Sequence, residues 1–267
     1  MKQYRFMMVG AHPDDMELRC GGVAQLLRQK GHQVRFVSMT DGSAGHQSMT
    51  REDLAARRRE EAQAVARLFD IEYTVMPIPD ACLTPTLEAR EMLMREIRTF
   101  APHVIITHRT NDYHPDHRAC GQLVMDCAYL VNVPLVCPDT PCPPYAPAIL
   151  SSWDPFTKPQ PFHPDIAVPI DGFVERKIDG VLCHVSQFYE WLPYIEGWTE
   201  VNAAETFEEK TARLRELLRE RFAEEARLYP EMTAQGVGYA ETFEWNEYGA
   251  PLSEELRCAM TDAPEQA

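Results

Sequence analysis

One histidine and three carboxylates stand within six residues near the start of the chain, directly behind the apolar run Phe6–Val9. They are His12, Asp14, Asp15 and Glu17. A second group, His114, Asp116 and His117, follows the apolar run Val104–Ile106. Each group stands at the end of a predicted strand, so the two groups indicate one site assembled by folding. Three or four of these side chains suffice to hold a divalent metal, and the others remain for acid/base chemistry.

A simpler explanation is helix capping. Pro13 and Pro115 each follow a histidine and suit the first position of a helix, where the missing N–H costs nothing. Acids in the first turn then complement the helix dipole, at about 0.3–1 kcal/mol each. This explains a single acid. It does not explain histidines and acids gathered at two strand ends, and the functional interpretation is favoured.

The spacing also predicts roles. His12, at a strand end, and Asp15, in the next helical turn, are expected to converge on one metal ion. His117 would complete a set of three ligands, two imidazoles and one carboxylate, which catalytic zinc prefers. Asp14 is then expected beside the metal without being a ligand. His114 precedes His117 by one helical turn, with Asp116 available to fix its tautomer.

The elements that must position these residues alternate between strand and helix. We expect strands at 4–10, 33–40, 73–78 and 104–107, separated by helices at 13–30, 51–69, 85–100 and 115–131. Such alternation predicts an α/β protein with a mostly parallel sheet and helices on both faces. Ligands bind at the carboxyl ends of such strands. Both clusters lie at such ends.

The second half of the chain is less regular. Eleven of the 21 prolines fall within 132–170, where short strands are expected at 148–153 and 166–169. This proline-rich segment is too long for a simple connection and is interpreted as a functional loop or a wall of the cleft. Helices are expected at 173–192 and 204–229, the latter amphipathic and packed on the body or on another subunit. We expect one domain over 1–267.

Composition excludes several classes of protein. The formal net charge of −15 argues against nucleic acid or an anionic membrane as partner. No signal-peptide core and no run of about 18 apolar residues is present, so a soluble protein without a membrane span is expected. Eight cysteines without a CxxC pair are typical of free thiols in a reducing cytoplasm. We predict a cytoplasmic location.

The two motifs carry a family resemblance. The segments 9–17 and 114–117 together resemble the PIG-L/LmbE family of zinc-dependent de-N-acetylases, and further similar segments extend over most of the chain. These are 20–22, 40–42, 58–62, 79–80, 175–179, 184–187 and 239–243. The resemblance implies a Rossmann-like three-layer α/β/α fold without a dinucleotide site. The absence of a GxGxxG motif after the first strand agrees with this expectation.

The resemblance also implies residue roles. Zinc is expected on His12, Asp15 and His117, with Asp14 as general base. His114 is expected to stabilise the oxyanion or to protonate the leaving amine. Two further residues are implied in substrate binding, Arg58 and, near the sugar hydroxyls, Asp80; for both, an ordinary surface role is an equally good interpretation. For His184, a structural role in the core is favoured.

Three departures from the family pattern stand out. Arg19 replaces a common glycine and is expected to place a charge near the edge of the site. Asp112 stands where some members have a tyrosine, and neither it nor Tyr113 is assigned a role. The helix within 200–235 is inserted where many members have a short link, and with the proline-rich segment it is expected to shape a pocket specific to this protein.

The predicted function is removal of acetyl from an N-acetylated amino sugar of the N-acetylglucosamine type, or from its conjugate. A deacylase of a non-sugar amide and a non-catalytic metal- or sugar-binding protein remain alternatives. A magnesium-dependent receiver or phosphoryl-transfer protein would not need the histidines, because magnesium prefers oxygen ligands. The expected partner is a small molecule, and the inserted helix is compatible with a homo-oligomer.

Overall fold

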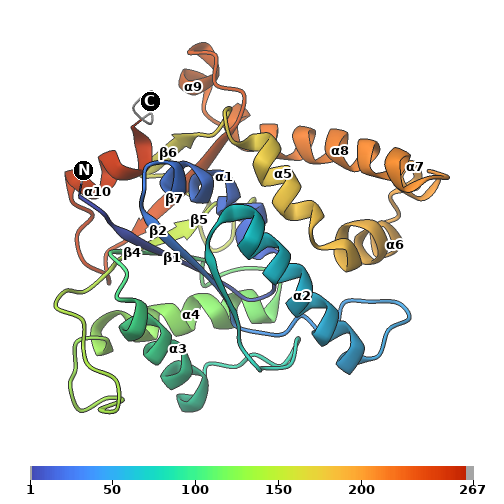
Figure 1. Ribbon diagram of the computed structural model, residues 1–267. Helices are drawn as coiled ribbons and strands as arrows, with labels where there is room; N and C mark the ends of the chain where they lie inside the picture. Colours follow the sequence, from blue (N-terminus) through green and yellow to red (C-terminus); the bar gives the residue numbers. More distant parts are fainter. Residues whose placement is uncertain (1, 263–267) are drawn as a thin grey trace.

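The computed structural model describes residues 2–262, which form a seven-stranded sheet between helices (Figure 1). The strands are β1 Arg5–Gly10, β2 Gln33–Ser38, β3 Glu72–Val75, β4 Val104–Thr107, β5 Ala148–Ser152, β6 Ile166–Pro169 and β7 Ala240–Asn246. Their order is β3-β2-β1-β4-β5-β7-β6, and only β7 runs antiparallel to its neighbours.

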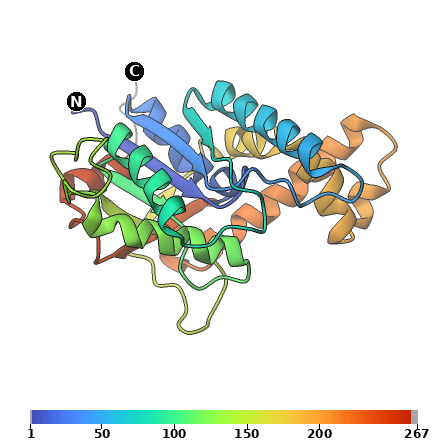
Figure 2. The ribbon, with the colours of Figure 1, turned by 90° about the horizontal axis from the view of Figure 1, so that it is seen from below.

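Helices cover both faces of this sheet (Figure 2). The helices are α1 Asp15–Gln29, α2 Arg51–Phe69, α3 Leu87–Phe100, α4 Pro115–Leu130, α5 Val174–Leu182, α6 Leu192–Ile195, α7 Thr199–Asn202, α8 Phe207–Arg227, α9 Pro230–Ala234 and α10 Glu254–Thr261. A π-helical turn, η1, spans Ser186–Trp191. The predicted three-layer α/β/α class with a mostly parallel sheet is confirmed. Among residues 2–262, none of the helices has the length and apolar character needed to cross a membrane.

Alternate residues of β1 enter two different cores. Phe6 and Met8 pack with α1 and α2, whereas Met7 and Val9 pack with α3 and α4 on the other face. All four side chains are fully buried. Continuous apolar runs of this kind are expected for strands covered on both faces. The first strand is therefore fixed between the two layers, and so is the turn that follows it.

The topology explains why two distant motifs meet. From β1 the chain builds outward through β2 and β3, then returns so that β4 pairs with the other side of β1. At this reversal of strand order a crevice opens outside the carboxyl ends of the two strands. The turn from β1 to α1 and the turn from β4 to α4 both enter it. Residues about 100 positions apart in the sequence thus become neighbours.

Three expectations about the second half need correction. The single helix expected at 173–192 is instead α5, η1 and α6, interrupted at 183–185. The final strand β7 and helix α10 were not predicted, since neither carries a strong periodic pattern. No residue of the proline-rich segment 132–170 is among the described residues lining the site cavity. Ala148, the first residue of β5, pairs with Val104, the first residue of β4. Residues 132–147 therefore lead into the amino-terminal ends of these strands, away from the carboxyl ends that carry the site.

The inserted helix α8 packs on the body of the molecule. Leu214, Leu218 and Phe222 are buried in a cluster with residues of α5 and η1. A capping box at Thr206 and Glu209 fixes its start. Its polar side reaches α5 through Arg219, which donates to Glu175 Oε1 at 2.6 Å. At the right of Figure 1, α8 lies beside α5 and joins α6 and α7 in a group of helices next to the sheet.

Candidate metal and acid/base site

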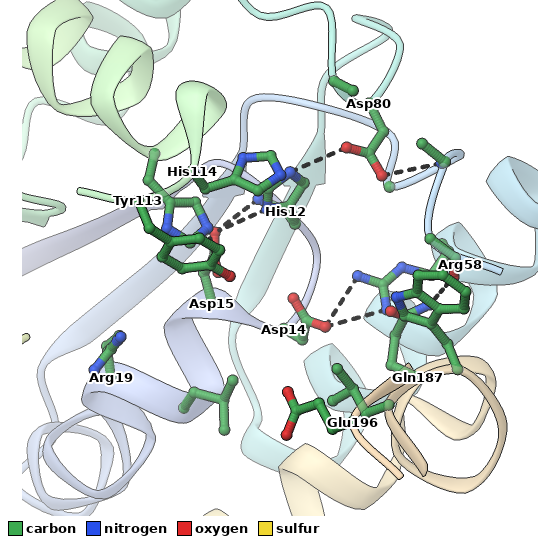
Figure 3. Close-up of a pocket in the computed structure, with 18 of the residues that line it drawn as sticks. His12, Asp14, Asp15, Arg19, Arg58, Asp80, Tyr113, His114, Gln187 and Glu196 are labelled. Carbon is green, nitrogen blue, oxygen red and sulfur yellow. Dashed lines mark hydrogen bonds and ion pairs between the residues drawn. The ribbon is translucent and has the colours of Figure 1, made fainter. Parts of the chain in front are cut away.

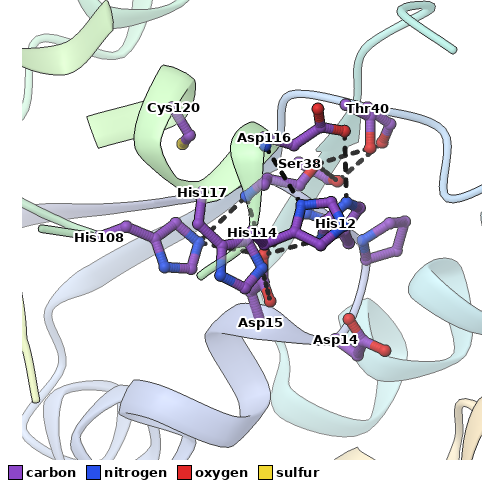
Figure 4. A network of polar contacts seen from close by, with 12 residues as sticks. His12, Asp14, Asp15, Ser38, Thr40, His108, His114, Asp116, His117 and Cys120 are labelled. Carbon is purple, nitrogen blue, oxygen red and sulfur yellow. Dashed lines mark hydrogen bonds and ion pairs between the residues drawn. The ribbon is translucent and has the colours of Figure 1, made fainter. Parts of the chain in front are cut away.

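Asp15 is the most constrained carboxylate of the site. Its Oδ2 accepts hydrogen bonds from the backbone N–H of Ala11 at 2.9 Å and of His12 at 2.8 Å. His108 Nε2 lies 3.0 Å from the same oxygen, and His117 Nε2 lies 3.4 Å from Oδ1. Burial opposes ionisation, but His117 and His108 outweigh it and hold the pKa of Asp15 well below its usual value. Asp15 is thus an ionised anchor for the surrounding imidazoles (Figure 4).

His12 stands at the centre of three carboxylates. Its Nδ1 lies 3.6 Å from Asp15 Oδ2, and its Nε2 lies 3.1 Å from Asp80 Oδ1 and 3.4 Å from Asp116 Oδ2. Burial opposes protonation, yet these three acids raise the pKa of His12 well above 6.5. Despite the short distances, the buried Nε2 has no hydrogen bond of good geometry within the described residues. A ring nitrogen of this kind is suited to a cation.

His117 completes the cluster from the first turn of α4. Its Nδ1 lies 3.0 Å from Asp112 Oδ1, and its ring is stacked on His108, with centroids 4.3 Å apart and planes 4° apart. Burial lowers its basicity, but Asp15 and Asp112 outweigh it and raise the pKa of His117 to about 9. A carboxylate on the second ring nitrogen is the usual partner of a metal-binding histidine.

The donor set of this region fits a divalent metal. The described residues hold three groups whose ligand atoms lie within 4.8 Å of one another: His12 with His114 and His117, Asp15 with His108 and His117, and His12 with Asp80 and Asp116. The expected set of His12, Asp15 and His117 is not itself one of these groups, but each of its members belongs to at least one of them. Mixed imidazole and carboxylate ligands suit zinc and its neighbours in the first transition row.

Asp14 adjoins Asp15 but has a different environment (Figure 3). Arg58 Nη1 donates to Asp14 Oδ2 at 3.3 Å, and the same guanidinium also donates to the Pro13 carbonyl. The backbone of Asp14 has φ 140°, outside the regions that residues with a Cβ normally adopt. Burial, opposed by Arg58 and assisted by Asp15, raises the pKa of Asp14. Asp14 thus combines a strained backbone with a carboxylate of raised pKa, next to the candidate metal ligands. Such a carboxylate is suited to proton transfer.

His114 is the N-cap of α4. Its Nδ1 accepts a hydrogen bond from the backbone N–H of Asp116 at 3.2 Å, so a neutral ring carries its proton on Nε2. Burial, together with His12 and His117, lowers the pKa of His114. The ring lies edge-on to His12, with centroids 4.6 Å apart, and lines the cavity.

The role expected for Asp116 must be corrected. Its carboxylate was expected to fix the tautomer of His114, but within residues 2–262 it accepts from the backbone N–H of Ala81 at 2.8 Å and of Leu83 at 3.2 Å. Its remaining contact is with His12. The backbone of Asp116 holds His114 instead, because an N-cap side chain pairs with the free N–H groups of the first turn.

Arg58 and Asp80, expected to bind substrate, both line the cavity but are engaged within the protein. Arg58 is 2% exposed behind Asp14, and Asp80 Oδ2 accepts from the backbone N–H of Ala44 at 3.0 Å. Hydrogen bonds from His12 and Ala44 outweigh burial and lower the pKa of Asp80. Their contacts to substrate stay predictions. What the structure shows is that Arg58 positions Asp14 and that Asp80 faces His12.

Glu17 and His184 lie in the core of the molecule. Glu17 Oε1 is 2.8 Å from His184 Nε2, and both side chains are fully buried. The structural role favoured for His184 agrees with this pair. Sequence reasoning missed His108, which stands one residue after β4, and left Asp112 without a role. Their only signal was their place between the strand end and His114.

A cavity of about 430 Å³ opens over these groups (Figure 3). Its described lining joins the β1–α1 turn, the loop after β2, the start of α4, the η1–α6 segment and α8. The side chains of the site are His12, Asp14, Asp15, Arg58, Asp80, His114 and His117, and the outer wall adds Arg19, Tyr113, Trp191, Glu196 and Arg221. This volume is in the range of small-molecule sites.

Comparison with known proteins agrees with the motifs. Residues 7–128 match the model of the PIG-L family, described as GlcNAc-PI de-N-acetylase. The diacetylchitobiose deacetylase of Thermococcus kodakarensis is 26% identical over 207 residues, which cover 72% of this chain and 74% of the relative. The 4-oxalmesaconate hydratase of Pseudomonas putida is 22% identical over 197 residues, covering 70% and 76%.

A solved structure has the same fold. The N,N'-diacetylchitobiose deacetylase of Pyrococcus horikoshii superposes with a TM-score of 0.72 and 23% identity, covering 92% of this chain and 84% of that one. The enzyme class predicted from the sequence, a hydrolytic deacetylase, agrees with the family description and with the Thermococcus relative. Residues 7–128, which include both histidine- and acid-rich motifs, therefore match the PIG-L family, as these motifs predicted.

Proposed function

We propose that this protein is a metal-dependent deacetylase that removes acetyl from an N-acetylated amino sugar or its conjugate. One observation carries the proposal. Asp14 has a raised pKa and is held by Arg58, while its neighbour Asp15 anchors the imidazoles of His117 and His108. A pure binding site has no use for such a second, separately held carboxylate. The family description and the Thermococcus relative favour an N-acetyl sugar as substrate.

His12, Asp15 and His117 would hold the metal, and zinc is the ion that this ligand set favours. A metal there would supply Lewis-acid chemistry, polarising the amide carbonyl and acidifying the attacking water. The residues around it orient this chemistry. Asp112 lies on the second ring nitrogen of His117 and fixes this imidazole from behind, whereas Asp80 lies 3.1 Å from Nε2 of His12.

Asp14 is the general base. It accepts the proton of the water that attacks the acetamide carbon, and its raised pKa strengthens it as a base near neutral pH. His114 donates from Nε2 to the oxyanion, because its Nδ1 is already occupied by the Asp116 N–H. The C–N bond then breaks as the nitrogen is protonated, by the Asp14 carboxyl or by His114. One water and one amide give acetate and a free amine.

The decisive experiment measures acetate. Purified protein loaded with zinc should release acetate from one or more N-acetylglucosamine conjugates, and Asp14→Asn should abolish most of this release. The matched control is Asp139→Asn, an exposed acid that pairs with Arg95 far from the site. Zinc-loaded parent protein that releases no acetate across such a screen would refute the proposal. A cytoplasmic location and a homo-oligomer stay predictions.

Hydration of an unsaturated carboxylic acid is a second candidate, because the Pseudomonas relative is a hydratase. One observation favours it: the arginines Arg19 and Arg221 line the outer wall of the cavity, where a carboxylate would be neutralised. The same base and metal would then activate water for addition to a carbon–carbon double bond. A conjugated unsaturated carboxylic acid would lose its ultraviolet absorbance when water adds to the double bond. Such a loss, without acetate release from N-acetyl sugars, would identify this reaction.

A further inference from the structure

Two arginines from separate elements face the outer part of the cavity. Arg19 lies on α1, one helical turn after Asp15, and Arg221 lies on the inserted helix α8. Arg19 donates to the Trp153 carbonyl at 3.0 Å, and its guanidinium lies 5.9 Å from the centre of the Trp153 ring. Arg221 makes no hydrogen bond within residues 2–262. Over the same range, neither guanidinium lies within 4 Å of a carboxylate.

Their environment is unusual for this chain. The protein carries a formal net charge of −15, and many of its arginines are paired with acids, as Arg219 is with Glu175. Arg221 is exposed, but the protein groups around it and the nearby charge of Arg19 lower its pKa, and Glu196 and Glu224 oppose this shift. Two like charges on one wall repel each other unless an anion lies between them.

One acid lies on the same wall. Glu196 lines the cavity, but its Oε2 accepts the indole N–H of Trp198 at 2.9 Å and it forms no ion pair with Arg221. The outer wall therefore carries two guanidiniums and one carboxylate. A neutral sugar has no need of two cations, whereas a carboxylate or phosphate matches the planar fork of a guanidinium.

We infer that Arg19 and Arg221 bind an anionic group of the substrate, so that the substrate is an acidic N-acetylated sugar conjugate. This inference rests on the proposed deacetylase function and names its substrate class. Arg19 lies four positions after Asp15 on α1, a rise of about 6 Å along the helix. The anion therefore binds about one helical turn from the metal ligands. Tyr113, 70% exposed, and Trp191 also line the cavity and offer aromatic faces to a sugar ring.

The anionic group is a carboxylate or a phosphate, and three substrates separate these cases. They are the neutral methyl glycoside of N-acetylglucosamine, N-acetylglucosamine 1-phosphate and N-acetylmuramic acid, which carries a carboxylate. We expect the zinc-loaded parent to favour at least one acidic substrate over the neutral one by about tenfold in kcat/KM, the scale of one charge-assisted hydrogen bond. The acid that is favoured identifies the anion.

Substitutions locate the effect. Arg221→Ala and Arg19→Ala should each lower kcat/KM for the favoured acidic substrate, mainly through KM, about tenfold more than for the neutral one. Arg221→Lys should retain part of the preference. The matched control is Arg213→Ala on the same helix, eight residues earlier and outside the cavity lining, which should change neither. A parent that favours the neutral substrate, or equal losses on neutral and acidic substrates, would overturn the inference.

A binding measurement distinguishes this inference from the proposed function. Titration calorimetry with glucose 1-phosphate and with glucuronic acid tests the anion site without any acetyl group. We expect one of them to bind to the parent and to Arg213→Ala, and to lose about tenfold in affinity in Arg221→Ala. Binding lost in this way, without acetate release from any substrate, would sink the deacetylase proposal and keep the anion site. Acetate release without binding of either anion would keep the deacetylase proposal and refute the anion site.

Discussion

Asp14 and Asp15 are adjacent and chemically identical, yet their carboxylates face different partners. Asp15 accepts two backbone N–H groups and contacts His108 and His117, whereas Asp14 contacts Arg58. The pKa of Asp15 is held well below its usual value and the pKa of Asp14 is raised. Carboxylates whose environments separate their pKa values in this way usually divide two roles between them. We therefore expect one to hold the metal and the other to move the proton.

Asparagine substitutions should separate these roles. Asp14→Asn keeps the shape but cannot accept a proton, so it should retain zinc while losing about 10²–10⁴ in kcat. Asp15→Asn should lose zinc instead, because a neutral amide is a poorer ligand than a carboxylate. Metal content and acetate release measured over a zinc titration check both. If excess zinc restores Asp14→Asn rather than Asp15→Asn, the two assignments must be exchanged.

Arg58 should set the pH range of the base. Its positive charge lowers the pKa of Asp14 against the effect of burial. Removal of that charge in Arg58→Ala should therefore raise this pKa further. The acidic limb of the kcat profile should shift to higher pH, since Asp14 must be deprotonated to act. Arg58→Lys keeps a charge and should shift it less. A limb that does not move in Arg58→Ala would mean that another group is the base.

Asp112 should tune metal affinity through His117. Its Oδ1 lies 3.0 Å from the Nδ1 of His117 and leaves Nε2 facing Asp15. Asp112→Asn should weaken zinc binding about 10- to 100-fold, the usual effect of losing such a partner. Competition with a chelator of known affinity measures this. The control is Asp126→Asn on the outer side of α4, where Asp126 accepts a hydrogen bond from Gln122. Equal affinities in parent, variant and control would remove Asp112 from the site.

Metal-free protein should lose stability as the pH rises. The pKa of His117 is raised to about 9 in the fold, above its unfolded value of about 6.5. Its stabilising contribution is thus fully present below pH 6.5 and is lost as the pH rises through about 9. The loss is on the order of 3 kcal/mol, because each pKa unit corresponds to about 1.4 kcal/mol.

Thermal unfolding in a chelator between pH 6 and 9.5 tests this expectation, and His117→Gln should flatten the decline. Zinc should bind more tightly over the same rise in pH, because it needs neutral imidazoles and displaces their protons. A metal-free protein whose Tm rises over this range would contradict the sign of the His117 shift.

His184 should matter for stability and not for chemistry. Its ring is fully buried against Glu17, away from the cavity lining. His184→Ala should lower the free energy of unfolding by about 2 kcal/mol, because Glu17 is left buried without its partner. Zinc content and kcat per folded molecule should stay near the parent values. A variant of normal stability that has lost activity would place His184 in the mechanism.

Much of this site followed from the sequence alone. The apolar runs before His12 and before His114 are long enough for buried strands, and the prolines after both histidines start helices. Alternating strands and helices then require a parallel sheet, whose carboxyl ends lie at one edge. Local signals of this kind act over a few residues, and for that reason the bounds of α2 and β4 could be predicted without a structure.

Other features were decided only by tertiary packing. Asp14 and Asp15 were told apart by spacing and family resemblance. Their opposite pKa shifts come from packing: burial raises the pKa of Asp14 against the charge of Arg58, whereas His117 and His108 lower the pKa of Asp15. The carboxylate of Asp116 faces His12 because the loop after β3 brings Ala81 and Leu83 to it. Arg221 faces the cavity because α8 packs on α5, more than 200 residues after His12. Charges and apolar faces act at contact distance, whatever their separation along the chain, so such partners appear only once the chain has folded.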